Sequence, residues 1–147
     1  MIQEGIYELL AANVGISALV GTQIFVGDAP PDLKQYPCIT YSLVGGSWDP
    51  TLRNSGTIRQ RVEFNGHAAA ASGGNGPAKV AAQIRQAVIL AVLKTLHPLD
   101  GAGSVLLADG TRVVDVKLLN PGTDFVTEDR IFRCMCEFYV YYTLPTS

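Results

Sequence analysis

The chain has 147 residues, 48% of them hydrophobic, and its 11 Lys and Arg against 13 Asp and Glu give a formal net charge of −2. This length and composition are typical of one folded domain, residues 1–147. The basic residues are scattered, so the positive patch that drives tight binding to nucleic-acid phosphates is missing. The longest uninterrupted apolar run, residues 87–93, is far shorter than the roughly 20 residues that span a membrane. We therefore expect no membrane partner.

The first quarter of the chain predicts two helical segments, a short strand and a loop. Asn13 and Gly15 supply stop signals after a run of apolar residues at helical spacing. Pro30, Pro31 and Pro37 remove backbone donors further along. In chain order, we predict an amphipathic helix over residues 2–13, one further helical turn over 16–20, a strand over 23–26, and a loop or extended edge over 28–37.

Two strands and a long connection follow. Both strands alternate apolar and polar residues, as half-buried strands do. In the second strand the polar face is charged and carries Arg59, Arg61 and Glu63. The connecting run GGSWDPTLRNSG is rich in turn-forming residues. The predicted segments are strands over residues 38–44 and 57–65, with a loop over 45–56.

The second half predicts a long helix, a hairpin and a last strand. Pro77 suits a first helical position, and the wide apolar stripe after it favours a helix that is packed on more than one side. Asp109-Gly110 is a dipeptide that supplies the positive φ angles of a tight hairpin turn. The predicted segments are a flexible loop over residues 67–76, a helix over 77–97, paired strands over 104–108 and 111–119, a loop over 120–128, and the longest strand over 130–142.

This order of elements predicts an α+β fold. We expect a largely antiparallel or mixed β-sheet, with the N-terminal helix and the one long helix packed on one face. The last strand separates its residues clearly. One side carries Phe132, Cys134, Cys136, Phe138, Val140 and Tyr142, and the opposite side carries Arg133, Glu137, Tyr139 and Tyr141.

No set of residues has the spacing that catalysis, metal binding or cofactor binding requires. His67 and His97 lie far apart, with no Cys or carboxylate at a ligand offset. The run GGNGPAK leads into a helix, but the residues that flank Lys79 are not the Gly and the Ser or Thr of a P-loop. A Gly-x-Ser-x-Gly nucleophile motif is absent. We predict a non-enzymatic chain with no catalytic residue, no metal and no cofactor.

The three cysteines are Cys38, Cys134 and Cys136. The last two are only two positions apart on one predicted strand, which suits a disulfide framework poorly. A free cysteine usually packs as a small apolar residue rather than acting as a thiolate. We interpret all three as free buried thiols in a reducing compartment.

The layout of these elements resembles the tail-completion family of tailed bacteriophages, which is related to tail terminator and tail-to-head joining proteins. The likeness is one of pattern and apolar spacing over nearly the whole chain, and the Gly- and Ala-rich segment after His67 departs from it. Three stretches carry it: MIQEGIYELLAANVGISALVGTQIF with YPCITYSLV, RVEFNG with AKVAAQIRQAVILAVL, and RIFRCMCEFYVYY.

The resemblance implies a virion protein of the tail or neck that is assembled in the host cytoplasm. It implies a ring, typically a hexamer, that caps the tail tube, ends its polymerisation and offers the surface to which the head docks. The implied partners are other copies of the chain, the tail tube protein and a head-completion or connector protein, with DNA only in transit through the channel. One alternative is another neck protein, such as a head-completion or stopper protein. The other is a small α+β enzyme or ligand-binding module.

In such a ring, loops and regular strand faces are where neighbours would meet or the channel would be lined. Trp48 either fixes its loop to its own domain or anchors a partner, and both interpretations stay open. The charged face of residues 57–65 is either solvated or a subunit contact. The candidate subunit-interface or channel-loop residues are Trp48, Asp49, Arg53, Arg59, Arg61, Glu63, Asp124 and Glu128.

Overall fold

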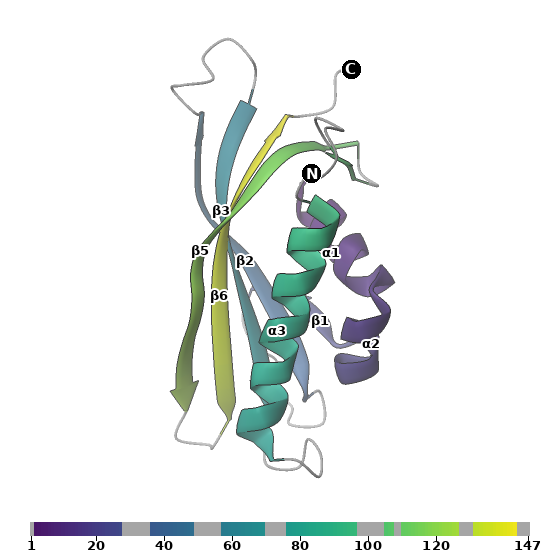
Figure 1. Cartoon of the computed structure of the whole chain (residues 1–147), viewed down its shortest axis with the longest axis vertical. Coiled ribbons are helices and arrows are strands. Elements are labelled where there is room, and N and C mark those ends of the chain that lie inside the picture. Colours follow the sequence, from purple (N-terminus) through teal and green to yellow (C-terminus); the bar gives the residue numbers. More distant parts are fainter. Residues whose placement is uncertain are drawn as a thin grey trace.

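A twisted β-sheet carries helices on one of its faces (Figure 1). The computed structural model describes residues 2–27, 36–48, 57–69, 76–96, 105–107, 110–126 and 131–143. The elements within these ranges are α1 (Ile2–Ala12), α2 (Val14–Val20), β1 (Ile24–Val26), β2 (Cys38–Trp48), β3 (Thr57–Ala68), α3 (Pro77–Leu96), β4 (Val105–Leu106), β5 (Arg112–Val126) and β6 (Phe132–Thr143). This arrangement confirms the predicted α+β class.

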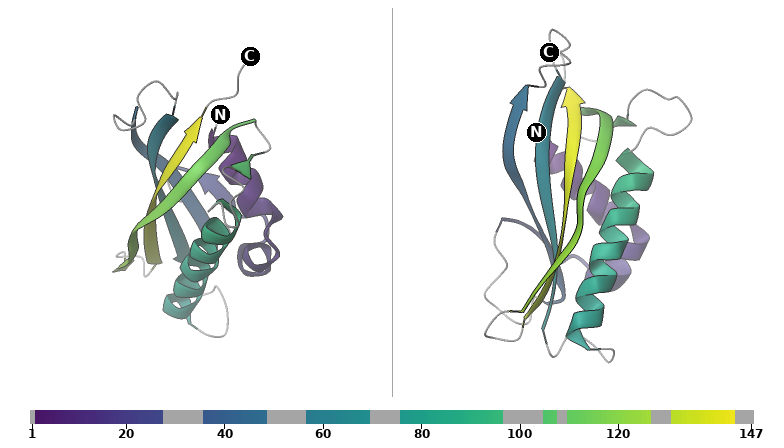
Figure 2. Two further views of the ribbon diagram at one scale, coloured as in Figure 1. Left: turned by 45° about the horizontal axis from the view of Figure 1, so that its top comes forward. Right: turned by 60° about the vertical axis from the view of Figure 1, so that its left-hand side comes forward.

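The sheet has six strands in the order β1-β2-β3-β6-β5-β4. β1 pairs with β2 in parallel, and each of the other neighbouring pairs is antiparallel. The four long strands β2, β3, β6 and β5 lie side by side, and α3 runs along the same face of the sheet as α1 and α2 (Figure 2). The predicted sheet, largely antiparallel with helices on one face, is confirmed.

The core lies between that face and the helices. The ring of Phe64 on β3 meets the ring of Phe138 on β6 edge to face, with the centroids 5.9 Å apart and the planes at 83°, and Tyr41 of β2 packs against Phe64 at 6.2 Å. Aromatic pairs in this geometry add to the stabilisation that burial itself provides. The helices cover these rings with buried aliphatic side chains, among them Ile6, Leu10, Ile16, Val20, Ile84, Val88 and Val92.

The cysteines are free and buried, as predicted. Cys134 and Cys136 lie on the helix-facing side of β6, between Phe132 and Phe138. Burial raises the pKa of the Cys136 thiol to about 12, and it raises the pKa of Cys38 to the same value. Both thiols therefore stay neutral and pack as small apolar groups.

The second helix is longer than the one turn expected. Asn13, interpreted as a stop signal for the first helix, is also the N-cap of α2, where its side-chain Oδ1 accepts a hydrogen bond from the backbone N–H of Ile16 at 3.0 Å. The cap satisfies a donor that the first helical turn leaves free. A single residue thus ends α1 and begins α2. No helix in the described part of the chain is long and apolar enough to cross a membrane.

Two strands extend into segments that composition predicted to be loops. Residues 45–48 belong to β2, residues 120–126 belong to β5, and β5 rather than the last strand is the longest of those described. Backbone hydrogen bonds to the long strands β3 and β6 extend β2 and β5, respectively. β-Bulges accommodate the turn-forming residues within these strands. Register shifts occur between Val44 and Gly46 in β2 and between Asn120 and Thr123 in β5.

The predicted flexible loop over residues 67–76 is also partly wrong. His67 and Ala68 are the last residues of β3, and both are buried. Each pairs with β6, and His67 pairs with Cys38 as well. Residues 70–75 of that predicted loop lie outside the described residues, as do residues 28–35 and 49–56.

Gly66 marks the place where α3 lies closest to β3. A Cβ atom built on Gly66 would lie 2.7 Å from Cγ2 of Ile84 and 3.0 Å from the backbone oxygen of Ala81. Because a backbone carbonyl cannot move aside as a flexible side chain can, the helix itself would have to shift. The absence of a side chain at this position permits the close packing.

We expect Gly66→Ala to lower the free energy of unfolding by about 1–3 kcal/mol, the usual cost of forcing an extra carbon into a packed core. Chemical denaturation of the purified chain measures the change. An unaltered midpoint with an unaltered slope would show that α3 does not press on β3 at this point.

Candidate interaction surface

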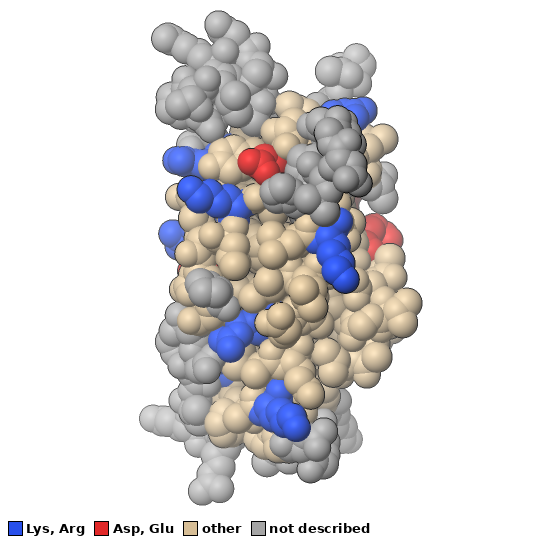
Figure 3. All heavy atoms as spheres, in the orientation of Figure 1, with Lys and Arg blue, Asp and Glu red and all other residues tan. Residues whose placement is uncertain are grey.

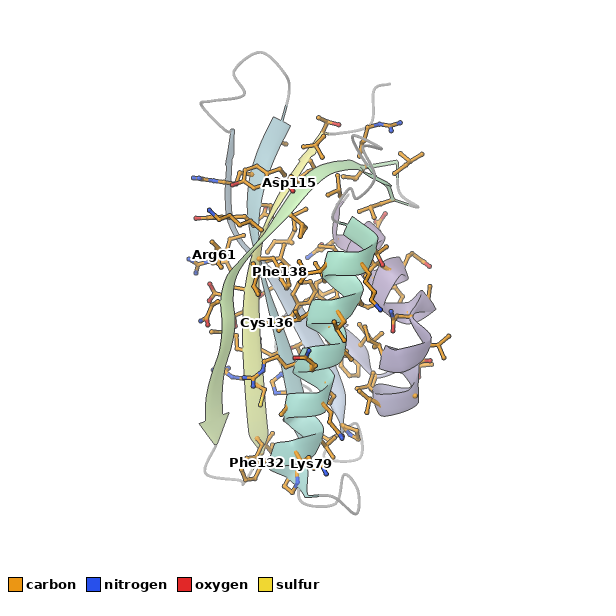
Figure 4. All side chains as sticks on the ribbon, viewed as in Figure 1. Arg61, Lys79, Asp115, Phe132, Cys136 and Phe138 are labelled. Carbon is orange, nitrogen blue, oxygen red and sulfur yellow. The ribbon has the colours of Figure 1, made fainter. Side chains whose placement is uncertain are left out.

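The sheet face that turns away from the helices, here called the outer face, is polar. β3 presents Arg59, Arg61 and Glu63 on it, in the alternation that the sequence predicts. Figure 4 shows Arg61 on the side of the sheet away from α3, while Cys136 and Phe138 lie between the sheet and that helix. The two sides of one pair of strands thus have different roles, a core on one side and a solvent-facing surface on the other.

A cluster of cations and tyrosines occupies one part of this outer face. Tyr139 of β6 pairs with Arg61 of β3 on one side and with Lys117 of β5 on the other. The guanidinium carbon of Arg59 lies 4.8 Å from the centre of the Tyr139 ring, within cation–π range. The ring of Tyr141 lies 6.3 Å from that of Tyr139 at 62°. We call Arg59, Arg61, Lys117, Tyr139 and Tyr141 the cation–tyrosine patch.

Acidic side chains border and orient the patch. Arg61 Nε lies 3.6 Å from Glu137 Oε2, and the two side chains are 41% and 16% exposed. A pair this open to water contributes about 0–1 kcal/mol to stability, so its main effect is to orient Arg61. Lys and Arg side chains gather along the left-hand edge of the molecule in Figure 3.

A polar pocket of about 190 Å³ lies further along the same face. Its lining residues are Gly27, Thr40, Ser42, Glu63, Asn65, His67 and Arg133. Several of these groups bond to one another. Thr40 Oγ1 and His67 Nε2 share a hydrogen bond of 2.8 Å, and Asn65 Nδ2 donates to Glu63 Oε1 at 3.0 Å.

His67 is 5% exposed, and the ring of Tyr36 meets its ring edge-on at 6.2 Å. Burial, and secondarily the positive charge of Arg133, lowers the pKa of His67 to about 4. The imidazole is therefore neutral at neutral pH and acts as part of a hydrogen-bonded cluster. Among the described residues, no group of three or more His, Cys, Asp or Glu could hold a metal ion.

The predicted contact residues fall into three sets. Arg59, Arg61 and Glu63 come together on the outer face of β3. Trp48 ends β2 opposite Ile58, and Asp124 lies in β5 opposite Cys134, but the side chains of both lie outside the described part of the structure. Asp49, Arg53 and Glu128 lie wholly outside the described residues.

Three members of the patch were not among the predicted contact residues. The alternation of residues 130–142 already placed Tyr139 and Tyr141 on the side of their strand opposite the apolar one. This alternation could have marked both tyrosines as candidate surface residues. Lys117 gave no such signal, because its position beside Tyr139 depends on the pairing of β5 with β6.

Comparison with known proteins identifies the family. The family model described as Tail completion protein gp17 matches residues 4–143. The chain belongs to this family. As a tail completion protein it is a structural component of a bacteriophage virion. Its assembly with other proteins of the particle follows from the same membership.

A solved structure supports the fold of this tail completion protein. A chain in the structure described as "Virion of native gene transfer agent (GTA) particle" superposes with a TM-score of 0.59 and 20% sequence identity, over 96% of this chain and 93% of that one. At this identity the likeness shows a shared fold. A comparison with curated proteins gave no match.

The His67 cluster gives this protein a specific pH dependence. An unfolded histidine has a pKa of about 6.5, so between pH 6.5 and 4 the unfolded chain binds a proton that the folded chain does not. Stability should therefore fall as the pH drops through this window. A His67→Gln variant should lose less stability than the unaltered chain between pH 7 and 4, by up to about 3 kcal/mol.

Urea denaturation at several pH values measures this difference. Near pH 8, where the imidazole is almost wholly neutral in both states, the difference between the two proteins should no longer change with pH, which serves as the internal control. Parallel stability curves over the whole range from pH 8 to pH 4 would contradict the lowered pKa.

Proposed function

We propose that copies of this chain form a hexameric ring that caps the finished tail tube, ends its polymerisation and provides the surface to which the head joins. The family match over residues 4–143 carries the proposal. The solved structure that shares this fold is described as a virion, which supports a place in an assembled particle.

The proposed partners follow from that position. One side of the ring contacts the tail tube protein, and the other contacts a head-completion or connector protein. DNA passes through the channel without being held, in keeping with a formal charge of −2. The ring belongs to the neck of the virion and is assembled in the host cytoplasm.

The proposed mechanism depends on shape rather than on chemistry. A contact between two different surfaces of the same protein either propagates without limit or closes into a ring, according to the rotation between neighbours. A ring that closes presents no further site for the next tube subunit. Growth then ends because of geometry, and no reactive group is needed.

The fold suits such a role because its two faces differ. The helices form one side of the molecule, and the polar outer face of the sheet forms the other (Figures 1 and 2). The long strands hold these sides at a fixed separation through a continuous core. A rigid subunit with two unlike sides is what a closed ring of identical subunits requires.

The segment between β2 and β3 tests this function. Trp48 pairs with Ile58, so replacing residues 49–57 by Asn-Gly keeps the register between the two strands and supplies a two-residue hairpin turn. The monomer should unfold at nearly the same denaturant concentration as the unaltered chain. Phage particles that carry only this variant should show overlong or unjoined tails in electron microscopy, because the candidate contacts Asp49 and Arg53 are lost.

A full-length chain with Asp49→Ala and Arg53→Ala is the matched control, since it separates the loss of the two charges from the shortening of the chain. Normal-length, head-joined tails from the shortened variant would contradict the role of this segment. Tails of normal length beside heads that leak DNA would instead assign the chain to head completion.

A further inference from the structure

We propose that neighbouring copies of the chain contact each other head to tail, with the cation–tyrosine patch of one copy docked on an acidic groove beside α1 of the next. This inference rests on the proposed ring and identifies the two surfaces that build it. The groove and the patch lie on different parts of one molecule, so each copy offers both.

The acidic groove has a volume of about 250 Å³. Its lining residues are Gln3, Glu4, Tyr7, Glu8, Val26 and Tyr41. Glu4 and Glu8 are one helical turn apart and so share a face of α1.

Part of the lining of the groove is apolar, and part of it is held by a hydrogen bond. Tyr7 is 38% exposed and Val26 is 50% exposed, which is a large exposure for apolar side chains that lie together beside a pocket. The hydroxyl of Tyr41 donates a hydrogen bond of 2.9 Å to the backbone oxygen of Gln3, and this bond ties β2 to the start of α1. A cation with an aliphatic stem, such as arginine, matches a groove that is lined by both apolar side chains and carboxylates.

The patch supplies arginine side chains that are already ordered before binding. Arg59 already lies over the ring of Tyr139, and Glu137 orients Arg61. Side chains that are already ordered lose less conformational freedom on binding. Tyrosine and arginine are also the residues that most often carry the binding energy of protein interfaces.

The charges of the two surfaces are complementary. The patch contains three cations, of which Arg61 lies beside Glu137, and the groove contains two carboxylates. Opposite potentials steer two proteins together and exclude pairings of patch with patch or groove with groove. The favoured contact is therefore between unlike surfaces, which is the kind that generates rings.

DNA is the other occupant that a cationic patch could attract. Glu137 contacts Arg61 within the patch, and Asp115 pairs with Tyr141 at its border. A phosphate backbone carries a charge at every nucleotide and would meet both carboxylates, whereas the groove brings only the two carboxylates of Glu4 and Glu8. The second copy is thus the occupant that the charges favour.

A charge swap within one chain tests the contact. In a head-to-tail assembly every interface joins the patch of one copy to the groove of the next, so Arg59→Glu or Glu8→Arg alone should weaken self-association about tenfold or more. The chain with both substitutions should recover most of the lost association. Sedimentation velocity of the full-length chain over a range of concentrations, at about 50 mM salt to limit screening, measures it.

Lys79→Glu is the matched control for Arg59→Glu, because it changes the net charge by the same amount at the far end of the molecule from Arg61 (Figure 4). It should leave association unchanged. Thermal unfolding of each variant verifies that the monomer still folds, and a variant that unfolds is replaced by Arg59→Gln or Glu8→Gln, with a smaller expected loss.

The outcomes separate this contact from the ring itself. Oligomers that survive both single substitutions, or a double variant no better than the singles, would overturn the contact and leave the ring in place. An unaltered chain that stays monomeric both alone and with tail tubes would overturn the proposed function. If Arg59→Glu abolishes binding to double-stranded DNA but spares self-association, the patch binds DNA and the proposal is wrong.

Discussion

The antiparallel pairing of β3 with β6 is the constraint on which the rest of the structure depends. It runs without a register shift from Thr57 opposite Thr143 to Ala68 opposite Phe132. This single register brings Phe64 to Phe138 beneath α3 and, on the opposite face, Arg61 to Tyr139. A slip of one residue would exchange the two faces, so that core residues would meet water and arginines would meet the helix.

The flanking strands β2 and β5 are less regular than the central pair. Their irregularities still keep the apolar residues on one face of the sheet and the polar residues on the other. Bulges in β2 and β5 let these strands follow the central pair past glycine and proline residues without losing their pairing at either end. As a result, Lys117 of β5 reaches the side of Tyr139 that Arg61 does not occupy. The patch is thus assembled from three strands, although only the central pair is regular.

Local sequence patterns could predict the elements that depend on nearest neighbours. The alternation in residues 57–65 and 130–142 predicted both faces of the central pair, Pro77 predicted the start of α3, and Asp109-Gly110 predicted the hairpin that β4 and β5 form. Strand extent was harder to predict, because the ladder that holds residues 120–126 is supplied by β6 and is invisible in their own composition. His67 was misjudged for the same reason, since its burial arises from contacts with Thr40 and Tyr36, which lie far away in the sequence.

The sequence predicted only Arg59 and Arg61 of the patch. The weakness of a contact between charged surfaces bears on how a ring would close. Exposed ion pairs are weak and screened by salt, so one contact between patch and groove is modest and open chains of subunits should dissociate readily. The last contact of a ring forms between ends that are already held near each other, at a high effective concentration. Closure then stabilises every subunit at once, and a surface that is too weak to sustain an open polymer still supports a complete ring. A modest charged contact is therefore better suited to a terminator than a large apolar one, which would favour uncontrolled growth.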